Sequence, residues 1–170
     1  MSIDNSSIEK MLDIITYDIN EGRPNDICHE LYNKYKEKFS GTLYHGFSDF
    51  KHHDINDLNS ILSGYVGFVS CSDKFVVAFD FAQSRTEKDT ENGVIFKINL
   101  ENVEVLKVSE FIVECFHQNP KMEICKYMYM NFAGEHEYLI LAEDMVSNIS
   151  SIEIINNKSE LKEYQKYFTS

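Results

Sequence analysis

The order of the secondary-structure patterns is the feature that most constrains the fold of this chain. Two helical patterns come first, and short strand-like segments follow from about residue 41. In the first helical pattern, apolar residues recur at the spacing of one helix face, at Ile8, Met11, Leu12, Ile15 and Ile19. Gly22 to Pro24 end the first pattern, and the second pattern runs over residues 26–39. Helices followed by many short strands predict an α+β fold with a mainly antiparallel sheet.

Local patterns predict the individual elements. We expect strands at residues 41–47, 65–72, 94–100, 101–108, 135–141 and 151–155. Further helices are expected at residues 54–62, 73–82, 120–129 and 159–168, with a polar loop at 83–92. A chain of 170 residues is long enough for one domain with an ordinary core. We therefore expect a single domain, 1–170, with a helical layer (1–40), a mixed sheet core (41–156) and a C-terminal helix or tail (157–170).

Composition excludes several classes of function. The net charge of −12 repels a phosphate backbone, so stable nucleic-acid binding is not expected, and a basic protein partner is favoured. No segment has the length and hydropathy of a membrane span, and the N-terminal residues lack a signal-peptide pattern. We therefore expect a cytoplasmic protein, or one that is delivered into a host cell.

No metal site is expected either. The four cysteines have neither C-x-x-C nor zinc-finger spacing. His52 and His53 are adjacent, so their side chains point apart on a strand or a helix, and no carboxylate stands at a ligand spacing from them. A metal hydrolase is therefore the weakest hypothesis. Glycine-rich Rossmann and P-loop motifs are also missing from the sequence.

Three short polar stretches carry candidate chemistry. At Tyr44–Gly46, a His before a Gly at a strand end can place an imidazole and a bare backbone in one pocket. At Ser70–Ser72, strand alternation puts both hydroxyls on one face, where they can orient a ribose or a carboxylate. At Glu135–Glu137, two carboxylates share one strand face about 6–7 Å apart, which disfavours their joint ionisation in a desolvated site. The structural alternatives are a turn histidine, a helix-capping serine and a solvated strand face.

Together the three stretches resemble the motifs of the ADP-ribosyltransferase fold of bacterial-toxin and phage-encoded mono-ADP-ribosyltransferases. That family has an aromatic-Arg-Gly strand, a Ser-Thr-Ser strand that runs into a helix, and a Glu-x-Glu strand. The corresponding stretches here are Tyr44-His45-Gly46, Ser70-Cys71-Ser72 and Glu135-His136-Glu137. The resemblance implies an ADP-ribosyltransferase-like split antiparallel sheet with N-terminal helices. It also implies an enzyme that cleaves the nicotinamide–ribose bond of NAD⁺ and transfers ADP-ribose to a protein side chain.

The resemblance also implies a role for each matching residue. Glu137 would bind the 2′-hydroxyl of the nicotinamide ribose and stabilise the oxocarbenium ion that forms as nicotinamide leaves. Glu135 would orient the acceptor, and a Glu at this position goes with arginine acceptors in the family. Ser70 would position Glu137, and Phe132 would touch the protein target. Contacts with NAD⁺ are implied for Tyr44, His45, Gly46, Ser70, Ser72, Phe75 and Arg85.

His45 departs from the toxin-like pattern, in which an Arg holds an NAD⁺ phosphate. A His is typical of the poly-ADP-ribose polymerase and diphtheria-toxin branch, which carries Tyr where this chain has Ser70. Of the two arginines, Arg23 and Arg85, we expect Arg85 to replace the missing phosphate contact, because its loop corresponds to a phosphate-binding loop of the family. Three alternatives remain: another acceptor, such as a nucleic acid or a small molecule; water as acceptor, which gives an NAD⁺ glycohydrolase; and a non-catalytic module that binds a partner.

Overall fold

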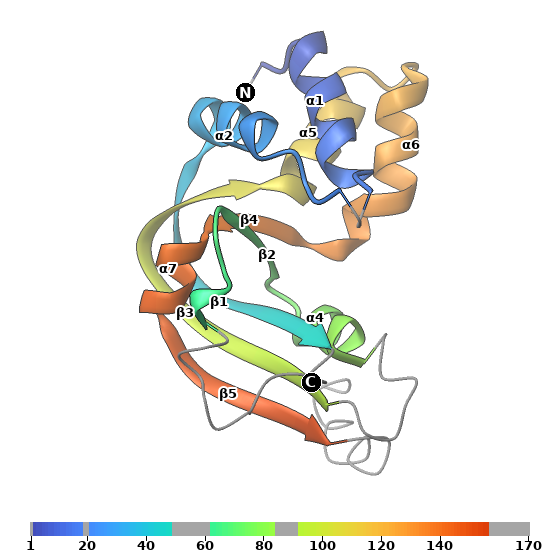
Figure 1. The fold of residues 1–170 in the computed structure, drawn as a ribbon. Coiled ribbons are helices and arrows are strands. Elements are labelled where there is room, and N and C mark those ends of the chain that lie inside the picture. Colours follow the sequence, from blue (N-terminus) through green and yellow to red (C-terminus); the bar gives the residue numbers. More distant parts are fainter. Residues whose placement is uncertain (1, 19–20, 49–61, 84–91, 157–170) are drawn as a thin grey trace.

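The protein has an α+β architecture built on a five-stranded antiparallel sheet (Figure 1). The computed structural model describes residues 2–18, 21–48, 62–83 and 92–156. The helices are α1 (Asn5–Ile15), α2 (Asn25–Tyr35), α4 (Phe75–Gln83), α5 (Val108–Gln118), α6 (Glu123–Phe132), the 3-10 turn η1 (Ala133–Glu135) and α7 (Ala142–Ser147). The strands are β1 (Glu37–Ser48), β2 (Phe68–Ser72), β3 (Asn92–Lys107), β4 (Glu137–Leu141) and β5 (Ile149–Asn156). The predicted α+β class is confirmed.

The strand order is β1-β2-β4-β3-β5, with an additional pairing between β1 and β3. The β1–β3 ladder is long and extends from Glu37 opposite Val105 to Ser48 opposite Gly93. By contrast, β1 meets β2 at one pair, Tyr44 opposite Ser72. Strand β2 pairs along its whole length with β4. The sheet therefore opens between β1 and β2, and the strand ends that carry the three polar stretches border this opening.

Helices α1, α2, α5 and α6 pack together over one end of the sheet (Figure 1). Their shared core contains large apolar side chains that are almost completely buried: Ile8, Met11, Ile14, Leu31, Phe111, Ile112 and Met128. Burial of one such side chain stabilises a fold by roughly 1.5–3 kcal/mol. Leu139 of β4 belongs to the same core, so the helical layer is fixed directly to the strand that begins at Glu137. The connection between α1 and α2 is thereby held near the start of β4.

Several elements differ from those predicted. Strand β3 is continuous where two strands were expected, because Asn102 adopts a left-handed backbone (φ 54°) and carries the chain through a bend without ending the strand. Its backbone N–H donates to the Ser40 hydroxyl (2.8 Å), which fixes the bend. Helix α5 was not predicted, although Val108, Phe111, Ile112 and Cys115 have helical spacing and are buried.

Some predictions lie outside the described residues. These are most of the helix at 54–62, the loop at 84–91, the terminal segment 157–170, and the side chains His52, His53 and Arg85. Within the part of the chain that the structure describes, no helix combines the length and apolar character needed to cross a bilayer.

Candidate active site

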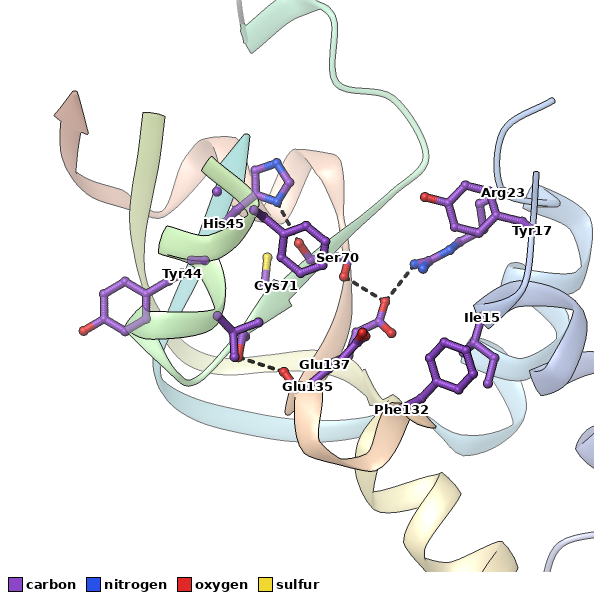
Figure 2. A pocket seen from close by; sticks show the side chains of 15 residues that line it. Ile15, Tyr17, Arg23, Tyr44, His45, Ser70, Cys71, Phe132, Glu135 and Glu137 are labelled. Carbon is purple, nitrogen blue, oxygen red and sulfur yellow. Dashed lines mark hydrogen bonds and ion pairs between the residues drawn. The ribbon is translucent and has the colours of Figure 1, made fainter. Parts of the chain in front are cut away.

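A cavity of about 370 Å³ lies between the helical layer and the open edge of the sheet (Figure 2). Pockets of this size are typical of small-molecule sites. Eight of the residues singled out in the sequence line it: Tyr44, His45, Gly46, Ser70, Ser72, Phe132, Glu135 and Glu137. The structure therefore brings the three polar stretches together at one cavity.

One row of paired residues explains this convergence. Tyr44 of β1 lies opposite Ser72 of β2, and Ser72 lies opposite Glu137 of β4. Residues directly opposite each other in a sheet project from the same face. The row therefore presents an aromatic ring, a hydroxyl and a carboxylate to the side of the sheet on which the cavity lies.

Glu137 is held rigidly at the centre of the cavity. Only 7% of this residue is exposed. The Ser70 hydroxyl donates a hydrogen bond to Glu137 Oε1 (2.7 Å), and Arg23 Nη1 forms an ion pair with the same oxygen (3.0 Å; Figure 2). The Glu137 backbone N–H donates to the Ser109 hydroxyl (2.7 Å). Both the backbone and the carboxylate of Glu137 are thus fixed before any ligand binds.

Glu135 does not share a strand face with Glu137, which corrects the prediction. It ends the turn η1, and His136 then adopts a left-handed backbone (φ 50°) before β4 begins. Both carboxylates nevertheless line the cavity. Burial, and secondly the charge of Glu137, raise the pKa of Glu135, while the Arg23 charge lowers it. Glu135 is thus a stronger proton acceptor than a solvated glutamate.

Ser72 connects the end of β2 to the turn that carries Glu135. Its hydroxyl donates to the Glu135 carbonyl oxygen (3.1 Å) and accepts from the Lys74 N–H (3.1 Å). The residue is buried, so it acts as a fixed support between these two segments. Both bonds go to the backbone, and Lys74 precedes the first residue of α4, so Ser72 stabilises the turn before the helix and does not cap the helix.

His45 bridges the opening between β1 and β2. Its Nδ1 lies 2.7 Å from the Ser70 carbonyl oxygen, and its Nε2 lies 3.1 Å from the Tyr65 hydroxyl. A carbonyl can only accept, so we assign the proton to Nδ1 and the lone pair to Nε2, which accepts from Tyr65. Burial lowers the pKa of His45, which favours this neutral form. Both ring nitrogens therefore have partners within the protein, and one of them holds the strand of Ser70.

Gly46 permits the close approach of α4 to β1. A Cβ atom on Gly46 would lie 1.8 Å from the carbonyl oxygen of Ala78, which also lines the cavity. The sequence suggests glycine at this position for backbone access by a ligand. The structure adds a packing reason, because any side chain here would displace α4.

Phe75, for which the resemblance implies a contact with NAD⁺, does not line the cavity. Helical phase turns it toward the sheet, where it is buried and its ring packs edge-on against Tyr44 at 5.4 Å between centroids. Val77 and Phe81, four residues apart on α4, line the cavity instead. Phe81 is 53% exposed and is the aromatic of this helix that a ligand can reach.

Sequence reasoning missed the contribution of the α1–α2 connection. Tyr17 and Arg23 of this connection line the cavity, together with Ile15 at the end of α1. The Arg23 guanidinium lies over the Tyr17 ring, with 4.9 Å from Cζ to the ring centroid. The chain has two arginines, and this rarity was the one sequence signal that could have marked Arg23 as a candidate site residue. Arg85, the arginine assigned to the site from the sequence, lies outside the described residues, so its role stays a prediction.

Comparison with family models, curated proteins and solved structures found no match. The geometry of the cavity and the resemblance of the three stretches therefore carry the functional inference. Among the described residues, no group of three or more His, Cys, Asp or Glu side chains could hold a metal ion.

Proposed function

We propose that the cavity binds NAD⁺ and that the protein is a mono-ADP-ribosyltransferase with a protein arginine as its acceptor. The observation that carries the proposal is the fixed, buried carboxylate of Glu137, which receives the Ser70 hydroxyl and lies in one cavity with Glu135. A fixed carboxylate beside the ribose favours cleavage of the nicotinamide–ribose bond, because positive charge develops on the sugar in the transition state.

The two carboxylates have separate roles in the proposed reaction. The bond between nicotinamide and C1′ breaks, and its electron pair leaves with the nicotinamide nitrogen. Glu137 accepts a hydrogen bond from the ribose 2′-hydroxyl and stabilises the oxocarbenium ion. A guanidinium nitrogen of the acceptor then attacks C1′, and Glu135 takes the proton that this nitrogen loses. The raised pKa of Glu135 suits it to this task as general base.

The surroundings of the cavity favour a basic protein as acceptor. The net charge of −12 attracts a cationic partner and repels a nucleic acid. Phe132 lines the cavity, and its ring lies 6.0 Å from that of Tyr127, which is half exposed on α6. Met130, on the same helix, is 72% exposed. Exposed aromatic and methionine side chains are common in protein-recognition surfaces.

The proposal is tested by incubating the protein with NAD⁺ and an arginine-rich peptide. We expect released nicotinamide and a peptide heavier by one ADP-ribose. Glu137→Gln keeps the shape of the side chain and removes its charge, and we expect it to lower the rate roughly 100- to 1,000-fold. Glu143→Gln is the matched control, because Glu143 is exposed on α7 and does not line the cavity.

The products separate this proposal from its alternatives. Free ADP-ribose without labelled peptide would contradict the transferase and indicate an NAD⁺ glycohydrolase. Label on a nucleic acid or a small molecule would keep the fold and change the acceptor. Failure of wild-type protein to bind NAD⁺ in calorimetry would leave the non-catalytic module as the better hypothesis.

A further inference from the structure

Among the described residues that line the cavity, Arg23 is the only lysine or arginine. It comes from the connection between α1 and α2, and its side chain is 20% exposed. Its ion pair with Glu137 occupies the same carboxylate oxygen that receives the Ser70 hydroxyl. A ligand hydroxyl that binds this oxygen therefore competes with Arg23.

The Arg23 guanidinium also has an N–H group that donates no hydrogen bond to the described residues. Arginine carries five N–H donors in a rigid plane. In the part of the chain that the structure describes, the buried Nε of Arg23 has no hydrogen-bond partner. Buried donors usually have an acceptor in folded proteins, so this Nε is available to an acceptor atom of a ligand. The Tyr17 ring supports the plane of the guanidinium without using its N–H groups.

The charge of the cavity indicates which ligand chemistry Arg23 can bind. Two carboxylates and one guanidinium give the described lining a net negative charge. Any ligand with phosphate groups is repelled by Glu135 and Glu137, and by the protein as a whole, unless a cation faces it. Arginine binds phosphate through two parallel N–H···O bonds, which would employ the free Nε together with an Nη.

We propose that Arg23 is the phosphate-binding residue of this cavity. In the structure it is paired with Glu137. When a phosphate-bearing nucleotide enters, the guanidinium moves to the phosphate and Glu137 is released to bind the ligand's ribose. The identity of the nucleotide as NAD⁺ rests on the proposed function. The proposal gives Arg23 the contact that the sequence assigns to Arg85.

The two fragments that hydrolysis of NAD⁺ gives, ADP-ribose and nicotinamide, test this assignment. ADP-ribose carries the diphosphate, and nicotinamide carries no phosphate. We expect Arg23→Gln to weaken ADP-ribose binding roughly 10- to 100-fold and to change nicotinamide binding less than about twofold, measured by calorimetry and ligand NMR. Arg23→Lys keeps the charge without the planar fork, so we expect an intermediate affinity for ADP-ribose. Lys10→Gln is the control, since it removes one partly exposed cation, paired with Glu30, from the same helical layer and away from the cavity lining.

The same measurements can overturn the assignment. Equal ADP-ribose affinity in wild type and Arg23→Gln would refute it and leave the proposed function intact. An equal loss for both probes would also refute it, because the cavity as a whole would then be damaged. A larger loss of ADP-ribose binding in Arg85→Gln than in Arg23→Gln would return the contact to Arg85. Wild-type protein that binds neither probe would refute the proposed function itself.

Discussion

Ser70→Ala is the substitution that most sharply tests how the site holds its carboxylate. It deletes the hydroxyl that donates to Glu137 Oε1 at 2.7 Å and leaves the backbone contact between Ser70 and His45 in place. A hydrogen bond to a charged acceptor contributes about 1.5–3 kcal/mol. If the bond orients Glu137 in the transition state, its loss slows the reaction by the same free energy, which is roughly 10- to 150-fold in rate.

The assay is the initial rate of nicotinamide release over a range of NAD⁺ concentrations at 25 °C. We expect kcat and kcat/KM to fall together, because the bond acts through a group that works in the transition state. The same loss lowers the melting temperature by about 2–4 °C per kcal/mol, so thermal unfolding must confirm that the variant is folded at the assay temperature. Ser70→Thr keeps the hydroxyl on a strand that suits β-branched residues and should retain more activity. A kcat within twofold of wild type, or a loss confined to KM, would show that the Ser70 hydroxyl does not orient Glu137 in the transition state.

Two further predictions concern the charges and the packing of the site. Glu137→Gln removes a like charge and should lower the pKa of Glu135. Arg23→Gln removes an opposite charge and should raise that pKa. Side-chain NMR titration of Glu135 measures both shifts, and an unchanged pKa in either variant would contradict the described electrostatics. Gly46→Ala places a Cβ 1.8 Å from the Ala78 carbonyl oxygen and should destabilise the fold by about 1–3 kcal/mol or more, measured by denaturant unfolding. Gly134→Ala, whose Cβ meets no atom within 4 Å, should change stability by less than about 0.5 kcal/mol, and equal effects would contradict the packing of α4 on β1.

The positions of the polar stretches on strands could be predicted because strand alternation is a local property. Ser70 and Ser72 do lie on β2, and Glu137 does begin β4. Glu135 could not be placed, since the left-handed backbone of His136 is uncommon for a residue other than glycine and leaves no pattern in the sequence. Strand β4 therefore begins two residues later than the sequence pattern predicts.

The contribution of Arg23 could not be predicted for a different reason. Its approach to Glu137 joins residues 114 positions apart and depends on how the helical layer packs on β4. Hydrophobic periodicity predicts the helices of that layer, but it carries no information about which connection between them reaches a given strand. The same limit applies to Phe75 and Phe81, because the direction from which α4 meets β1 decides which of the two lines the cavity.

The most direct test that NAD⁺ binds with its nicotinamide ribose at Glu137 is a crystal structure of the Glu137→Gln variant soaked with NAD⁺. We expect slow turnover in this variant, so that the bound NAD⁺ persists. We expect NAD⁺ in the cavity of Figure 2, with the hydroxyls of the nicotinamide ribose within hydrogen-bond distance of position 137. An empty cavity at saturating NAD⁺, or a bound molecule whose nicotinamide ribose faces away from position 137, would contradict this expectation.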